Sequence, residues 1–193
     1  MRRIELPVTK FALALAAMAV LISCSVNVRK ESNGEDKQVD IKTPMGSVHV
    51  SKGADPQDVG IVVYPGARLK ESDDEGGDKS ANVSVSGFGY GVKVAALEYE
   101  SNDAPEKVVA FYQDQLKRYG NVLVCRTSHF HVDTDIDRHS NSHELTCEGS
   151  GGVGIELKAG SKENQHLVAI EPEGSGSKFS LVYVRVHGKE ADL

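Results

Sequence analysis

The feature that most constrains the fold is a series of short segments in which apolar and polar residues alternate. In the C-terminal part of the chain such segments cover residues 122–126, 143–148, 153–158, 166–171 and 179–186. Alternation with a period of two is typical of strands that bury one face. Because the connections between consecutive segments are short and rich in turn residues, we expect neighbouring strands to be antiparallel.

The same alternation precedes these segments. Val39 and Ile41 alternate with polar residues, as do Val48 and Val50 after the turn at residues 43–46. Residues 82–86 and 92–99 form a second pair, joined by the glycine-rich stretch 87–91. Turn residues between alternating runs predict hairpins.

Only residues 104–118 show convincing helical periodicity over a long segment. Its apolar residues recur at spacings of three and four, at Val108, Phe111, Tyr112, Leu116 and Tyr119, which predicts an amphipathic helix. We expect Asp103 to cap its N-terminus, with Glu106 completing a capping box. The predicted fold is therefore α+β, with one amphipathic helix packed on an antiparallel sheet, in a single globular domain over residues 39–193.

The first 23 residues predict an export signal rather than part of the fold. A positively charged start is followed by an uncharged apolar run over residues 11–22. A membrane-spanning helix needs about 20 apolar residues, so this shorter run is typical of a signal peptide. The following Leu21-Ile22-Ser23-Cys24 resembles the lipobox of bacterial lipoproteins. The resemblance implies that the signal peptide is cleaved before Cys24 and that the thiol of Cys24 is acylated.

Acylation of Cys24 would place the protein in the cell envelope, bound to a membrane through its N-terminal lipid. Ser25 stands where an Asp would favour retention in the inner membrane, so the resemblance favours the outer membrane, facing the periplasm. Residues 24–38 are polar and without periodicity after the cysteine, and we expect them to form a flexible tether. The globular domain would then stay near the bilayer without touching it.

Composition excludes some classes of partner. The chain has 28 acidic and 22 basic side chains, a net charge of −6, and no Trp. A nucleic-acid-binding protein needs a basic surface to neutralise phosphates, so we expect no nucleic-acid partner.

Cys125 and Cys147 remain once Cys24 carries a lipid. In an oxidising compartment an even pair predicts a disulfide. The alternative is a thiol pair that binds a metal or acts as a redox centre, but the sequence has no CxxC.

The loop between these cysteines is rich in histidine and aspartate. Four of the seven histidines lie in it: His129, His131, His139 and His143. Imidazoles suit zinc, copper or nickel, so a metal site is the alternative to an exposed loop without a ligand. A calcium loop of the EF-hand type is disfavoured, because Arg138 stands where the sharp turn needs glycine.

Two further motifs resemble a known pattern. Val63-Tyr64-Pro65-Gly66-Ala67 and the helix start Pro105-Glu106-Lys107-Val108 resemble segments that recur in uncharacterised exported bacterial proteins. The resemblance implies a small α+β domain of the envelope, without an assigned activity.

No motif for catalysis stands out. The sequence has no GxSxG, and residues 149–154 fit GxGxxG but precede a predicted strand rather than the helix that a dinucleotide site needs. We therefore expect no enzyme, no cofactor and no nucleotide partner. The primary hypothesis is a lipid-anchored binding or scaffolding domain with an envelope protein partner, contacted through Phe88 and Tyr90 or through a groove beside the helix. The alternative is a metal-binding lipoprotein that uses loop 129–144.

Overall fold

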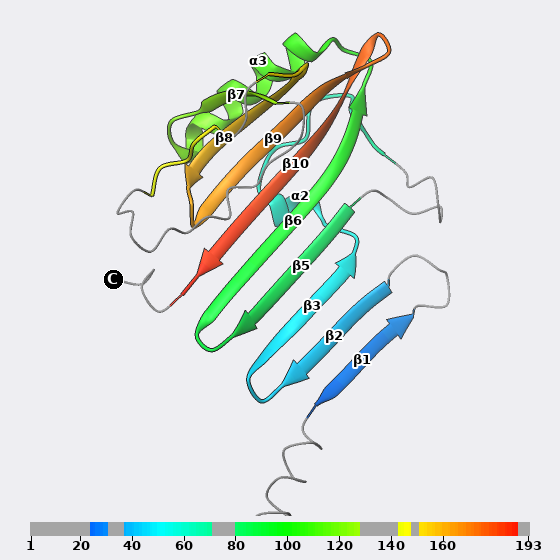
Figure 1. Cartoon of the computed structure of the whole chain (residues 1–193). Helices are drawn as coiled ribbons and strands as arrows, with labels where there is room; N and C mark the ends of the chain where they lie inside the picture. The colour runs from blue at the N-terminus through cyan, green and yellow to red at the C-terminus, as the bar shows by residue number, and fades with distance from the viewer. Residues whose placement is uncertain (1–23, 31–36, 71–79, 128–142, 148–150, 189–193) are drawn as a thin grey trace, which may run out of the picture.

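A computed structural model describes residues 24–30, 37–70, 80–127, 143–147 and 151–188 of the chain (Figure 1). The described strands are β1 (Ser25–Lys30), β2 (Lys37–Thr43), β3 (Gly46–Lys52), β4 (Arg68–Leu69), β5 (Ser80–Gly87), β6 (Tyr90–Ser101), β7 (Leu123–Thr127), β8 (Gly154–Ser161), β9 (Asn164–Glu173) and β10 (Gly176–His187). The described helices are α2 (Pro56–Val59), α3 (Pro105–Leu116) and the 3₁₀ turn η1 (Lys117–Tyr119).

The strands form one antiparallel sheet in the order β1-β2-β3-β5-β6-β10-β9-β8-β7, with β4 paired to β6 (Figure 1). The fold is broadly α+β, as predicted, but the sheet dominates it and the helices are short. Hairpins join β2 to β3, β5 to β6, β8 to β9 and β9 to β10, because their connections are short enough to be turns.

Helix α3 packs on one face of the sheet, against β8, β9 and β10. Its buried residues are Val108, Tyr112 and Leu116, so the predicted apolar stripe is confirmed. The predicted cap is wrong: the N-cap residue is Ala104, which makes no side-chain cap bond. The carboxylate of Asp103 instead accepts hydrogen bonds from the Lys107 ammonium and the Tyr64 hydroxyl, and these bonds lower its pKa, that from Lys107 most.

Aromatic side chains fill the core between α3 and the sheet. Phe179 stacks on Tyr99 at a centroid distance of 5.7 Å and lies 5.6 Å from the ring of Tyr112. The backbone N–H of Tyr64 donates to the Tyr112 hydroxyl over 3.0 Å. This bond satisfies a polar atom that the helix buries, and it ties the segment before β4 to α3.

The start of the predicted tether is a strand. Residues 25–30 form β1, which pairs with β2 so that Val26 lies opposite Ile41 and Val28 opposite Val39. Both valines therefore extend the apolar rows of β2 by one strand, as cross-strand partners do. Residues 31–36, also predicted as tether, lie outside the described residues.

The predicted strand at residues 143–148 is absent from its described part, residues 143–147. That segment is held instead by the bond between Cys147 and Cys125 and by a hydrogen bond of 3.0 Å from the N–H of Lys162 to the carbonyl of His143. Its backbone therefore has no ladder partner, although its ends are fixed.

The helices found within the described ranges are all too short or too polar to cross a bilayer.

Candidate functional site

Strand register places ten aliphatic side chains on one face of five neighbouring strands. Successive residues of a strand point to opposite faces, so cross-strand partners share a face. One row runs through Val26, Ile41, Val48, Val85 and Val92, and the next through Val28, Val39, Val50, Val83 and Val94. We call these ten residues the open apolar face.

The other side of the same strands is polar. Cross-strand partners there include His49 and Asp40, whose ring nitrogen and carboxylate oxygen lie 2.6 Å apart, and Ser47 and Ser86, whose hydroxyls lie 2.9 Å apart. This part of the sheet is therefore amphipathic, with methyl groups on one face and hydrogen-bonding side chains on the other.

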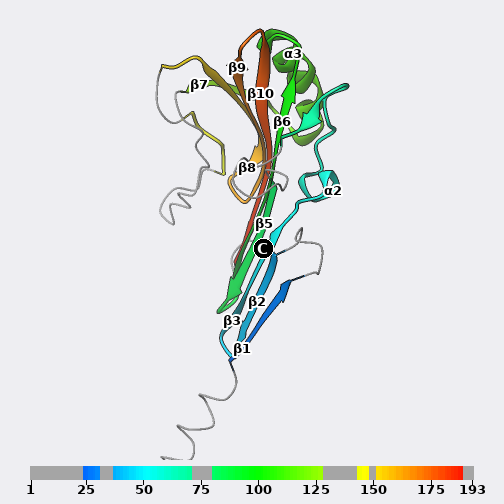
Figure 2. The same cartoon turned by 90° about the vertical axis from the view of Figure 1, so that its right-hand side faces the viewer.

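Nothing in the described part of the chain forms a second layer over the open apolar face. Helices α2 and α3 lie on the opposite side of the sheet (Figure 2). Val26 and Val28 keep 64% and 61% of their surface exposed, and Val85 and Val92 are exposed as well. The other six residues of the face are half-buried, and Val94 packs against the buried cluster of β9 and β10. An apolar sheet face is normally covered by another layer, and a contiguous exposed apolar patch marks an interaction site.

Two hairpin tips close one end of this face. The N–H of Phe88, in the β5–β6 turn, donates to the carbonyl of Met45, in the β2–β3 turn, over 3.3 Å. Glycine is required at the contact, because a Cβ on Gly46 would come within 2.2 Å of the Ser86 carbonyl oxygen. The two tips are thus locked side by side.

The tips expose large apolar side chains. Phe88 is 74% exposed, Met45 63%, and Tyr90 is exposed too. Between them lies a hollow of about 450 Å³, whose apolar lining includes Ile41, Met45, Val48, Val85, Phe88, Tyr90 and Val92. Sequence reasoning selected Phe88 and Tyr90, and the structure brings them together with the apolar strands. Sequence reasoning did not select Met45. The position of Met45 between Pro44 and Gly46, in a predicted turn, could have indicated that its side chain is exposed.

Cys24 belongs to the same end of the sheet. It is exposed and directly precedes β1. Ser25 pairs with Lys42, next to the β2–β3 turn, and Gly46 pairs with Gly87, next to the β5–β6 turn. We call Cys24, Met45, Phe88 and Tyr90 the tip end.

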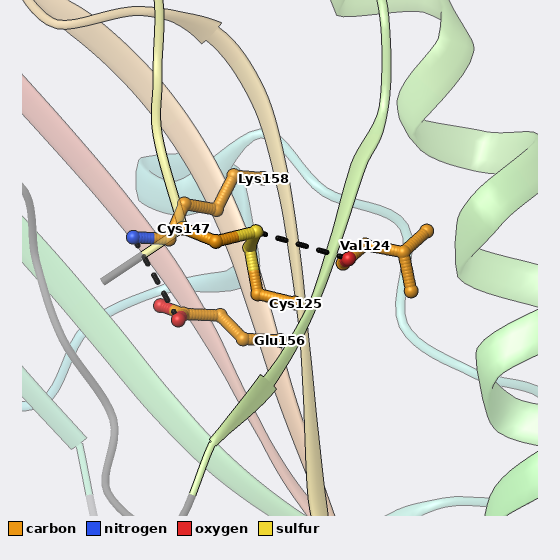
Figure 3. Close-up of a disulfide and its surroundings, with 5 residues drawn as sticks. All are labelled: Val124, Cys125, Cys147, Glu156 and Lys158. Atoms are coloured by element: carbon orange, nitrogen blue, oxygen red, sulfur yellow. Dashed lines mark hydrogen bonds and ion pairs between the residues drawn. A yellow bond between two sulfur atoms is a disulfide. The ribbon is translucent and has the colours of Figure 1, made fainter. Parts of the chain in front are cut away.

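Cys125 and Cys147 are joined by a disulfide, as predicted, with their Cα atoms 5.4 Å apart (Figure 3). Cys125 lies opposite Glu156 of β8, on the face turned away from Leu157 and α3. The Cys147 sulfur lies 3.8 Å from the carbonyl oxygen of Val124.

Two charged side chains beside this disulfide are completely buried. The ammonium of Lys158 lies 3.7 Å from the carboxylate of Glu156, and neither side chain is exposed to solvent (Figure 3). A buried charge is tolerated when an opposite charge accompanies it. The second face of β8 is therefore closed, in contrast to the open apolar face at the other edge of the sheet.

Most of the predicted metal-binding loop, residues 129–142, lies outside the described residues. His129, His131 and His139 lie outside the described residues. The ring nitrogen Nδ1 of His143 lies 2.6 Å from Oε1 of Glu163, and the Ser161 hydroxyl donates a hydrogen bond of 2.8 Å to Oε2 of the same carboxylate. Among the residues with described positions, no cluster of three or more His, Cys, Asp or Glu side chains could hold a metal ion.

His166 lies far from the open apolar face, on the α3 side of β9. Its ring stacks on Tyr119 at a centroid distance of 3.6 Å, and Tyr119 donates a hydrogen bond to the Gly60 carbonyl. The ring of Tyr183 is tilted against that of His166, with the ring centroids 5.0 Å apart. Burial lowers the pKa of His166 to about 4, so the ring is neutral at pH 7. Its environment is that of a core residue.

The groove predicted beside the helix is present as a depression of about 470 Å³. It lies between α3 and β7 and is lined by residues that include Gln113, Asp114, Lys117, Val122 and Val124. Its lining is more polar than that of the tip hollow, so it offers less apolar surface to a partner.

Comparison with known proteins adds no assignment: no family model, curated protein or solved structure matches the chain.

Proposed function

We propose that this chain is a lipid-anchored cell-envelope protein that acts by binding rather than catalysis, and that the open apolar face is its binding surface. The observation that carries the proposal is the continuity of ten aliphatic side chains over five strands, next to exposed Met45 and Phe88. Burial of apolar surface is worth roughly 25 cal/mol per Å², so a partner that covers this face gains binding energy without a directional polar contact.

The anchor is supported by the lipobox-like Leu21-Ile22-Ser23-Cys24 and by the exposure of Cys24. The signal peptide, the acylation of Cys24 and a place in the outer membrane belong to the proposal. Mass spectrometry of the full chain purified from bacterial membranes tests it. We expect a mature chain that begins at Cys24 and carries acyl groups; an uncleaved, unmodified chain would refute the anchor.

The binding surface is tested with an apolar fluorescent dye on the same purified protein. Val85→Ser and Val92→Ser, on paired positions of the open apolar face, should lower dye binding severalfold. Val62→Ser is the matched control, because Val62 is similarly exposed but lies outside that face. Equal binding by all three variants and the wild type would show that the face is not the binding surface.

The alternative of metal binding through His129, His131, His139 and His143 stays a prediction.

A further inference from the structure

We propose that the tip end of the sheet contacts the lipid bilayer directly, with Met45 and Phe88 inserted beside the acyl groups of Cys24. The inference rests on the proposed lipid anchor and goes beyond it. The anchor alone requires only that Cys24 be held at the membrane, whereas this inference assigns the membrane as the partner of the tip end and of the row of the open apolar face next to it.

The first argument is the distance between the anchor and the sheet. Cys24 directly precedes β1, and Val26 follows two residues later. A strand rises about 3.3 Å per residue, so Val26 lies within roughly 7 Å of Cys24 along the chain. A lipid on Cys24 therefore brings the edge of the open apolar face to the bilayer surface, because no tether separates them.

The second argument is which side chains share that end. The register places the β2–β3 turn and the β5–β6 turn level with the start of β1. Met45 and Phe88 at these turns are among the most exposed large apolar residues described. Exposed apolar and aromatic side chains on one end of a protein are typical of insertion at a membrane interface.

The third argument is charge. The chain has a net charge of −6, yet the two tips, residues 42–47 and 86–91, contain no acidic residue and one basic residue, Lys42. The ten residues of the open apolar face are all aliphatic. Because the tips have no acidic side chain, their insertion requires no carboxylate of the tips to leave water. It also causes no repulsion between the tips and anionic headgroups.

A second copy of the chain is the main competing occupant. Face-to-face packing of two copies would cover the valine rows as in a sandwich. It would not explain why the exposed Met45 and Phe88 lie level with Cys24. The bilayer accounts for both observations, so we assign the contact to lipid.

The test uses single-tryptophan variants, because the chain contains no Trp. Phe88→Trp and, independently, Met45→Trp place the reporter at the tip end. Val153→Trp is the matched control, because Val153 is 79% exposed and lies at the opposite end of the sheet. Val153 directly precedes β8, and Ile155 of β8 pairs with Ile170 of β9, close to the β9–β10 turn. Each full chain is processed in bacteria, purified from membranes and reconstituted into vesicles of phosphatidylethanolamine and phosphatidylglycerol, with or without brominated acyl chains.

We expect brominated lipid to lower the emission of Phe88→Trp and Met45→Trp by about twofold or more, since interfacial segments bury about 5–10 Å deep. The emission of Val153→Trp should stay unchanged. Circular dichroism confirms that the variants are folded, and mass spectrometry reports acylation of Cys24.

The outcomes separate the two proposals. Acylated protein in vesicles, with neither tip reporter quenched, overturns the bilayer contact and leaves the anchor standing. A blue-shifted but unquenched tip reporter overturns it in favour of a second copy. Protein without acyl groups on Cys24 overturns the anchor and this inference together.

Discussion

The two halves of the sheet repeat the same alternation of apolar and polar residues but differ in what lies against them. On β9 and β10, one face packs under α3, and the other buries Leu167, Val182 and Val184. On β1, β2, β3 and β5, one face is polar and the apolar one stays partly exposed, with Val26, Val28 and Val85 exposed and its other residues half-buried. A buried strand pair stabilises the fold, whereas an uncovered apolar face costs solubility unless it has a partner.

The difference has a local cause. After β6 the chain forms α3, which covers one face, and the segment bound through Cys147 lies beside the other, near Glu156 and Lys158. Among the described connections before and into β6, turns join β2 to β3 and β5 to β6, and the short helix α2, between β3 and β4, lies on the polar side (Figure 2). Within its described residues, the first half of the chain therefore supplies no layer over the open apolar face: its segment 54–69, which includes α2, packs on the other side of the sheet, in the core beside α3.

The largest expected effect lies in the packed part. Phe179→Ala should lower the free energy of unfolding by about 3–5 kcal/mol, because the ring is fully buried between Tyr99 and Tyr112 and its removal leaves a cavity. Denaturation with urea measures the change. A loss below about 1 kcal/mol would mean that this core is no better packed than the open edge.

Loss of the disulfide should cost somewhat less. The double variant Cys125→Ala, Cys147→Ala frees a loop whose ends are 22 residues apart, which corresponds to about 3 kcal/mol in the chain-entropy model. Urea denaturation of the oxidised wild type and the double variant measures it. Reducing agent should destabilise the wild type and leave the double variant unchanged; equal stability of all samples would contradict the prediction.

His166 should make the packed part sensitive to acid. Its pKa is about 4 in the folded protein and about 6.5 when unfolded, so between these values the unfolded chain binds the additional proton. The contribution of His166 to the free energy of unfolding is therefore fully present above pH 6.5 and is lost as the pH drops towards 4. We expect the free energy of unfolding to fall by about 2 kcal/mol between pH 7 and pH 5.

Urea denaturation at both pH values tests this, with His166→Gln as the control. The variant should lack the part of the pH dependence that His166 causes. If the stability of His166→Gln depends on pH as steeply as that of the wild type, His166 is not the cause of the acid sensitivity.

The smallest effect is expected on the open apolar face. Val85→Ala removes methyl groups that are already exposed and should change the free energy of unfolding by at most about 0.5 kcal/mol. The same urea assay checks it. A loss comparable to that of Phe179→Ala would show that the face is buried in the isolated protein.

Several elements could be predicted from sequence because their signals are local. The stripe Val108, Tyr112 and Leu116 predicted α3, and alternation around glycine-rich turns predicted the hairpins β2–β3 and β5–β6. An even number of cysteines after Cys24 predicted the disulfide. In each case a few neighbouring residues, or a count, carried the information.

Other features depend on contacts between distant residues. Val26 and Val28 lie in a short segment of mostly polar residues, which predicted a tether. Their strand is defined only by its pairing with Ile41 and Val39 of β2. Glu156 and Lys158 alternate like solvent-facing residues, and the structure buries them. Alternation also indicated that β3, β5 and β6 have an apolar face, but it could not show which strands would lack a second layer.

The most direct test of the open apolar face is carbene footprinting of the processed, full-length wild type in detergent-free vesicles. The comparison state is the same protein extracted in a mild detergent that is then exchanged for an amphipathic polymer. We expect lipid vesicles to protect Met45, Phe88 and Val26, while Val153 and Val62 are labelled equally in both states. Labelling of Met45 and Phe88 as strong as that of Val153 in vesicles would contradict the claim that this end of the sheet binds the membrane.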